Sequence, residues 1–108
     1  MKEIFYKDKP VNVLKVLGSD DGYYWYYNIW FEYEGERFYI CNAGSGSGWI
    51  PYFAAIIRGE FERLWSDNDR FYDDINEYHV EHLITDLLGK LGDQNSYEER
   101  EEDRYENW

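Results

Sequence analysis

Two histidines separated by about one helical turn are the strongest candidates for metal ligands in this chain. His79 and His82 have Glu81 between them, and Asp86 follows one turn later. Imidazole and carboxylate groups can hold zinc, but a zinc site needs three or four protein ligands in a tetrahedral arrangement. No third and fourth ligand of suitable type recurs nearby, so we interpret the two histidines as surface or partly buried side chains.

Two other segments match ion-binding or phosphate-binding loops only in part. Asp67-Asn68-Asp69 begins like a calcium loop, but Tyr72 stands where that loop needs Gly and Tyr78 where it needs a bidentate Glu. The glycines of residues 42–49 (NAGSGSGW) do not complete the dinucleotide-binding spacing, and no Lys-Ser/Thr pair follows them. The sequence therefore predicts no metal and no cofactor.

Patterns typical of catalysis are also missing. The chain has no nucleophile elbow and no paired-acid signature, and Cys41 lies within a predicted strand, where a small apolar residue fits. We therefore expect that the protein is not an enzyme. Aromatic side chains on a sheet face can stack on sugars, so a carbohydrate-binding module stays as an alternative.

Carboxylates are the groups that the chain has in excess, and they are densest at residues 66–81 (SDNDRFYDDINEYHVE). If this segment is helical, Asp73, Glu77 and Glu81 lie one turn apart on one face, with Asp74 beside them. A spacing of roughly 6 Å per turn is comparable to that of phosphates along a DNA strand. The row can be interpreted as a solvated acidic face or as a surface that replaces phosphates, and the pattern favours both interpretations equally.

The net charge separates these function classes further. Against 11 Lys and Arg, the 23 Asp and Glu give a formal net charge of -12 and a pI near 4.4. Phosphate repels such a chain, and the cations form no patch, so we expect no direct nucleic-acid binding. Aromatic residues make up 21% of the chain, which supplies more burial than a disordered acidic chain carries.

The length of 108 residues predicts a single α+β domain over 1–92, followed by an acidic tail, mobile or helical, over 93–108. A single cysteine cannot form an internal disulfide, and residues 1–10 are too charged for a signal peptide or a membrane span. We therefore expect a protein of the reducing cytoplasm that does not contact membranes.

Alternating apolar residues predict strands in the first half of the chain. Residues 11–17 form a first strand that ends at the turn 18–22, and a hairpin follows around Glu34-Gly35. A two-residue turn there pairs Tyr33 with Glu36, Phe31 with Phe38, Ile29 with Ile40 and Tyr27 with Asn42. One face then carries Tyr27, Ile29, Phe31, Phe38 and Ile40, and the opposite face is a mixed surface that can face water while its aromatic rings stay partly covered.

Helices are predicted in the second half. After a flexible connector over 42–48, apolar residues from Phe53 to Trp65 recur at three and four. A second helix, capped by Ser66 or Asp67, buries Phe71, Ile75 and Tyr78. A third stripe, Val80, Leu83, Leu87 and Leu91, lies on nearly the opposite side of a continuous helix, which favours a break between Tyr78 and Val80. The expected fold is thus an antiparallel sheet of about three strands packed against two to three helices.

The order of these elements and several short motifs resemble a small type II-A anti-CRISPR protein. The motifs are Gly18-Ser19-Asp20 after the first strand, Glu34-Gly35-Glu36-Arg37-Phe38 at the hairpin, and Asp67 to Asp74 (DNDRFYDD). The resemblance covers roughly residues 11–80. It implies a phage-encoded inhibitor that mimics DNA and occupies the cleft in which a type II Cas nuclease binds the protospacer-adjacent motif.

The resemblance also implies which residues meet the basic residues of the nuclease. In that family these are the acids of the hairpin loop and of the run before Phe-Tyr, which correspond here to Glu34 with Gly35 and to Asp67, with Asp20 as a further candidate. Asn68, followed by Asp69, stands where the family has an acid, and Arg37 stands where it has a glutamate. Together with the acidic row, this gives a partner-binding set of Asp20, Glu34, Gly35, Asp67, Asn68, Asp69, Asp73, Asp74, Glu77 and Glu81. An immunity protein or antitoxin, or an antirestriction protein, would use the same electrostatics on another basic partner and stays open as an alternative.

Overall fold

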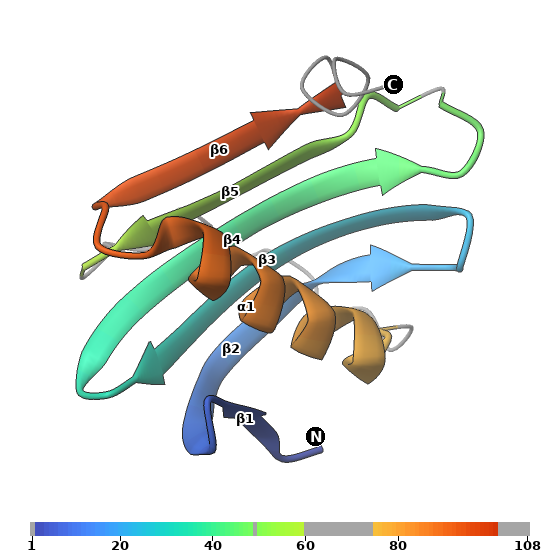
Figure 1. Ribbon diagram of the computed structural model, residues 1–108. Coiled ribbons are helices and arrows are strands. Elements are labelled where there is room, and N and C mark those ends of the chain that lie inside the picture. The colour runs from blue at the N-terminus through green and yellow to red at the C-terminus, as the bar shows by residue number, and fades with distance from the viewer. Residues whose placement is uncertain (1, 49, 60–74, 102–108) are drawn as a thin grey trace.

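The structure is a computed structural model that describes residues 2–48, 50–59 and 75–101. Within these residues, six strands form one antiparallel sheet in the order of the chain, and a single helix lies against it (Figure 1). The prediction of about three strands with two to three helices is therefore wrong. The elements are β1 (Ile4–Tyr6), β2 (Lys9–Asp20), β3 (Tyr24–Tyr33), β4 (Glu36–Ser45), β5 (Phe53–Arg58), α1 (Glu77–Leu91) and β6 (Ser96–Arg100).

The hairpin of β3 and β4 has the predicted register. Tyr33 pairs with Glu36, and the pairing continues residue by residue to Tyr24 and Ser45. Glu34 and Gly35 both have positive φ, 54° and 76°, which is the backbone geometry that a tight two-residue hairpin turn requires. The predicted inner face is also confirmed, since its five apolar side chains are at most 3% exposed.

An irregularity in β2 changes which of its side chains face the helix. The register between β2 and β3 shifts between Val13 and Lys15, so Leu14 has no direct partner and is 44% exposed. A bulge of this kind reverses the alternation of inward and outward side chains. As a result Val13 and Val16, although three residues apart, both pack in the core, and Asp20 lies on the helix-covered side.

Two segments predicted as connector and helix are strands instead. β4 continues to Ser45, so residues 42–45 belong to the sheet and not to a flexible connector. Residues 53–58, predicted as the start of a helix, form β5 and pair with β4 from Ala43 to Phe38. The sequence FAAIIR satisfies both a helical and a strand period, and pairing with β4 decides between them. The second helix was predicted mostly over residues that lie outside the described part of the chain.

Helix α1 explains the predicted break. Its N-cap is Asn76, whose side chain accepts hydrogen bonds from the backbone N–H groups of Tyr78 and His79, so helical geometry begins at residue 77. The stripe of Val80, Leu83, Leu87 and Leu91 is buried as predicted. Ile75 precedes the helix and packs against the core, but Tyr78 is 72% exposed, so the prediction that it anchors this segment is wrong.

The segment after the helix was predicted as a tail, yet residues 96–100 form β6 at the edge of the sheet. Tyr97 and Glu99 lie on the side of α1, where the Glu99 carboxylate accepts hydrogen bonds from Lys90, Tyr52 and Tyr97 at 2.7 to 2.8 Å. Hydrogen bonds in which the donor or the acceptor is charged are stronger than those between neutral groups. Residues 102–108 lie outside the described part of the chain.

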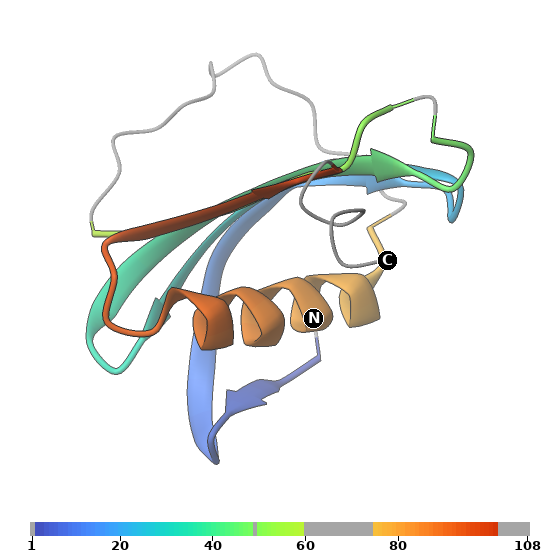
Figure 2. The ribbon, with the colours of Figure 1, turned by 45° about the horizontal axis from the view of Figure 1, so that its top comes forward.

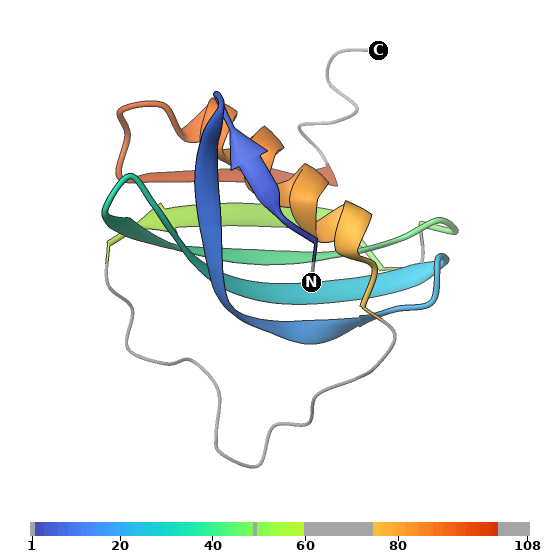
Figure 3. The same ribbon diagram turned by 90° about the horizontal axis from the view of Figure 1, so that it is seen from below.

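Figures 2 and 3 show that the sheet curves around α1, with β1 on the same side as the helix. The core fills the space between them with side chains from β1 to β5 and the helix. A smaller cluster lies on the opposite face, where Leu17, Trp30 and Tyr39 are 5 to 8% exposed. That face was predicted to be mixed with partly covered rings, and the rings of Trp30 and Tyr39 are buried more fully than predicted.

We expect Leu87→Ala to destabilise the fold by about 2–5 kcal/mol, because it removes a fully buried side chain beneath the sheet and leaves a cavity. Urea unfolding followed by circular dichroism measures this change. Leu14→Ala is the matched control, since the same substitution at the exposed bulge should change stability by no more than about 0.5 kcal/mol. Equal losses at both positions would contradict the observed placement of the helix.

Candidate partner-binding site

The predicted partner-binding residues fall into three places in the fold. Glu34 and Gly35 form the turn between β3 and β4, Glu77 and Glu81 lie in the first half of α1, and Asp20 ends β2. These groups are separate: the turn is at one end of the sheet, and Asp20 and the start of α1 are at the other (Figure 1). Asp67, Asn68, Asp69, Asp73 and Asp74 lie outside the described residues.

Asp20 belongs to a hydrogen-bond network that attaches α1 to the sheet. Its Oδ2 accepts from the Tyr27 hydroxyl and is 2.8 Å from His79 Nδ1, and its Oδ1 accepts from the Gly22 N–H at 2.9 Å. The Tyr27 hydroxyl in turn accepts from the backbone N–H of Asn76 at 2.9 Å. The network thus joins the end of β2, the middle of β3 and the N-cap of the helix.

The protonation of Asp20 follows from these contacts. Burial alone would raise the pKa of its carboxyl, but the hydrogen bonds from His79, Tyr27 and Gly22 outweigh burial and hold the pKa below its usual value. The side chain of Asp20 is only 4% exposed, and both oxygens are occupied. In this structure Asp20 is therefore a structural residue and is not displayed to a partner.

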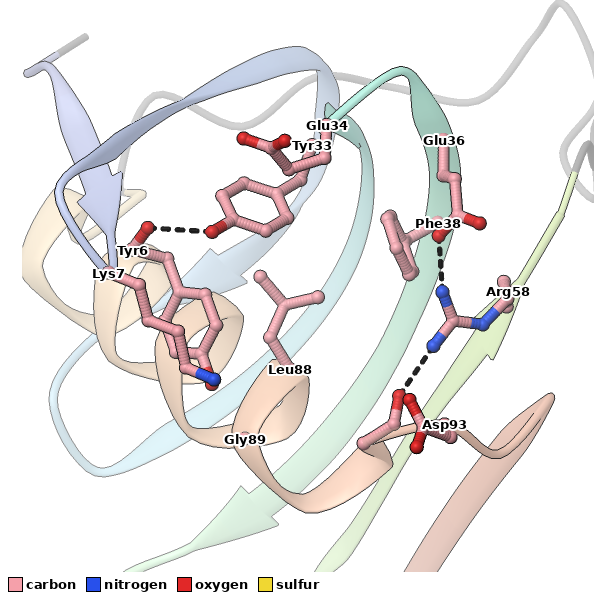
Figure 4. Close-up of a pocket in the computed structure, with 11 residues that line it drawn as sticks. Tyr6, Lys7, Tyr33, Glu34, Glu36, Phe38, Arg58, Leu88, Gly89 and Asp93 are labelled. Atoms are coloured by element: carbon pink, nitrogen blue, oxygen red, sulfur yellow. Dashed lines mark hydrogen bonds and ion pairs between the residues drawn. The ribbon is translucent and has the colours of Figure 1, made fainter.

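Glu34 borders a cavity of about 330 Å³ at the other end of the sheet, which we call the hairpin-end cavity (Figure 4). Its walls come from the turns after β1 and β3, from β4 and β5, and from the end of α1. Tyr33 donates a hydrogen bond to the Tyr6 carbonyl at 2.8 Å, and their rings meet edge to face. The lining residues are Tyr6, Lys7, Tyr33, Glu34, Glu36, Phe38, Arg58, Leu88, Gly89, Gly92 and Asp93.

Three of the charged side chains that line this cavity, Glu34, Glu36 and Arg58, form ion pairs. Arg58 forms an ion pair with Glu36 and donates to the Gly92 carbonyl at 2.6 Å, which ties β5 to the end of the helix. Glu34 forms an ion pair with Lys9 at 3.3 Å, and both side chains are about half exposed. Asp93 was not among the predicted residues, and only the return of the chain after α1 brings it beside Arg58.

The acidic row predicted for a helix is only partly present. Helix α1 begins at Glu77, so it contributes Glu77 and Glu81 to the row. Glu81 forms an ion pair with Lys2 at 3.1 Å, which attaches the N-terminal segment to the helix. Glu77 in the first turn suits the positive end of the helix dipole. Both carboxylates therefore also have structural roles.

His79 and His82 do not form a metal site with their neighbours. Within 2–48, 50–59 and 75–101, no group of three or more His, Cys, Asp or Glu side chains is arranged to hold a metal ion. His79 is instead bonded to Asp20, and its ring contacts those of Trp25 and Tyr27 edge to face. Sequence spacing could not reveal this, because Asp20 and His79 are 59 positions apart.

The helix that the structure describes is too short and too polar to span a membrane.

Comparison with protein-family models, with curated proteins and with solved structures gave no match to this chain.

We expect Asp20→Asn to lower the free energy of unfolding at pH 7 by about 1–3 kcal/mol, because it removes a charged acceptor from a buried network. Since the folded-state pKa of Asp20 is lowered, its contribution is fully present above the unfolded-state pKa near 3.8 and is lost as pH falls through the lower folded-state value. Urea unfolding between pH 3 and pH 7 should therefore show the two proteins converging in acid.

Asp93→Asn is the control for this pH series, because Asp93 is exposed and its loss should change stability by no more than about 0.5 kcal/mol. A difference between wild type and Asp20→Asn that stays constant down to pH 3 would show that the charge of Asp20 does not stabilise the fold.

Proposed function

We propose that this protein is a stoichiometric inhibitor that binds a basic nucleic-acid-binding protein, with its carboxylates in the place of DNA phosphates. A type II Cas nuclease, at the cleft that binds the protospacer-adjacent motif, is the first target to test. Arg and Lys in such clefts form charge-assisted hydrogen bonds with carboxylates as they do with phosphate. An inhibitor of this kind would act in the cytoplasm of a cell that hosts a phage or mobile element.

The distribution of charge is the observation that supports this proposal most. The net charge is -12, and most cations of the described residues are already bound to carboxylates of the same chain. These contacts are Lys2–Glu81, Lys9–Glu34, Arg37–Glu32, Arg58–Glu36, Lys90–Asp86, Lys90–Glu99 and Arg100–Glu98. Cations dispersed in this way form no patch that could attract nucleic acid, whereas the excess carboxylates attract a basic protein.

Charge supports an acidic inhibitor of a basic protein, whereas only the resemblance supports a type II Cas nuclease as its target. The resemblance to the anti-CRISPR family used an order in which helices follow the hairpin, and the described chain has β5 in that position. Glu34 keeps the placement that the resemblance implied, in an exposed two-residue turn, while Asp20 is buried. Glu34 is therefore the described residue of the predicted set on which a test should concentrate.

We expect Glu34→Lys to weaken inhibition of DNA cleavage by at least about tenfold, equivalent to ~1.4 kcal/mol, because it places a cation against a basic cleft. Purified type II Cas nucleases, a restriction endonuclease and basic nuclease toxins form the panel, and the potency of inhibition is measured for each. Inhibition should also weaken as salt rises, since screening reduces attraction between opposite fields.

Glu98→Lys is the matched control. Glu98 resembles Glu34 in being about half exposed and in having one exposed cation partner, but it lies on β6. Both variants change the net charge equally, so a difference between them separates a located contact from general charge. Inhibition of none of the panel by the wild-type protein, or equal inhibition by both variants and the wild type, would refute the proposal.

A further inference from the structure

Three exposed tyrosines lie at the start of β3, which is at the opposite end of that strand from the β3–β4 turn. Tyr23, Tyr24 and Tyr26 are 50%, 41% and 42% exposed, although tyrosine rings normally bury most of their surface. Beside them lies a hollow of about 280 Å³, which we call the tyrosine hollow. Its lining residues are Ser19, Asp21, Tyr24, Trp25, Tyr26, Ala43 and Ile50.

The strand register explains why this surface is hollowed. Tyr26 is paired with Ser19 of β2 on one side and with Ala43 of β4 on the other. Directly opposed side chains of a sheet normally cover each other, but these two neighbours are small. Tyr24 is likewise paired with a small residue, Ser45. The small side chains leave space beside the tyrosine rings, which stay accessible from solvent.

Of the described residues that line this hollow, Asp21 is the one that is charged at neutral pH. Its Oδ1 accepts hydrogen bonds from the backbone N–H groups of Tyr23 and Tyr24 at 2.8 and 2.7 Å, which fixes the carboxylate against the turn. These bonds hold the pKa of Asp21 below its usual value, so it is ionised at neutral pH. Among the described residues, none binds its Oδ2.

Aromatic faces beside a fixed carboxylate are the features that recognise a planar cation. A guanidinium group can stack on a tyrosine ring and donate hydrogen bonds to a carboxylate in the same position. The hairpin-end cavity is less suited to such a ligand, because Glu34 and Glu36 already form ion pairs with Lys9 and Arg58, and a further guanidinium would compete with these cations. Among the described residues that line the tyrosine hollow there is no cation, and the whole chain carries a net charge of -12.

We propose that the tyrosine hollow binds the guanidinium group of an arginine side chain, supplied by the basic partner. The identity of the arginine's source rests on the proposed function, but the binding chemistry of the hollow does not. Tyrosine rings also stack on neutral sugars, and the single carboxylate in a strongly negative field favours the cation over the sugar.

The hollow is tested by itself with N-acetyl-arginine amide as probe, followed by two-dimensional NMR titration of the wild-type protein. N-acetyl-citrulline amide, which has nearly the same shape without the charge, is the matched ligand. We expect signals of the Tyr24 and Tyr26 region to shift with the arginine derivative, and the citrulline derivative to bind at least ~5-fold more weakly.

Two variants locate the binding. Tyr26→Ala removes a wall of the hollow and should weaken arginine binding by ~5-fold. Asp21→Asn retains an oxygen that can accept the two backbone hydrogen bonds, so it removes the charge while keeping the turn, and a similar loss is expected. Tyr78→Ala is the control, because it deletes an equally large and more exposed tyrosine on α1 and should leave binding unchanged.

Equal binding of the arginine and citrulline derivatives, or an unchanged affinity in Asp21→Asn, would overturn the proposal. Binding of a neutral glucose tetrasaccharide without binding of the arginine derivative would assign the hollow to sugar instead. Arginine binding by a protein that inhibits no member of the nuclease panel would refute the proposed function and leave the hollow standing. Inhibition of a nuclease without arginine binding would refute the assignment of the hollow and leave the proposed function standing.

Discussion

The hydroxyl group of Tyr27 joins the parts of the chain that must meet for the helix to cover the sheet. It accepts from the backbone of Asn76, which caps α1, and donates to Asp20, which also binds His79. The cap therefore fixes both where the helix begins and how it sits on β3. This network requires the bulge in β2. Without the bulge at Leu14, inward and outward side chains would not exchange faces, and the Asp20 carboxylate would lie on the face of the sheet away from α1.

The fold also divides the carboxylates of an acidic chain between two uses. Asp20 and Glu99 hold α1 and β6 in place through their contacts with His79 and Lys90. Asp21 and Glu34 lie near opposite ends of β3. A strand of ten residues spans roughly 30 Å, close to the length of nine base pairs of duplex DNA. A partner that met both ends at once would need a basic cleft of about that length.

Local patterns predicted the elements whose contacts are local. The hairpin register followed from Glu34-Gly35 and strict alternation, and the buried stripe of α1 followed from its spacing. The sequence did not reveal β5, because its six apolar-rich residues fit both periods. It did not reveal β6 either, because the distant Lys90 and Tyr52 stabilise its Glu99. For the candidate site, the exposure of Glu34 was predictable, whereas the burial of Asp20 depends on a bulge and a distant histidine.

The strand order has a consequence for how the chain folds. From β1 to β5 each strand pairs with its neighbour in sequence, and closing such short loops is fast. β6 must find β5 across residues 59–95, which carries a larger loop-closure cost. The β1–β5 meander can therefore form first, with Phe31 and Ile40 open to water until α1 docks. In that interval the nascent sheet is most exposed to aggregation, and its high negative charge would then keep chains apart.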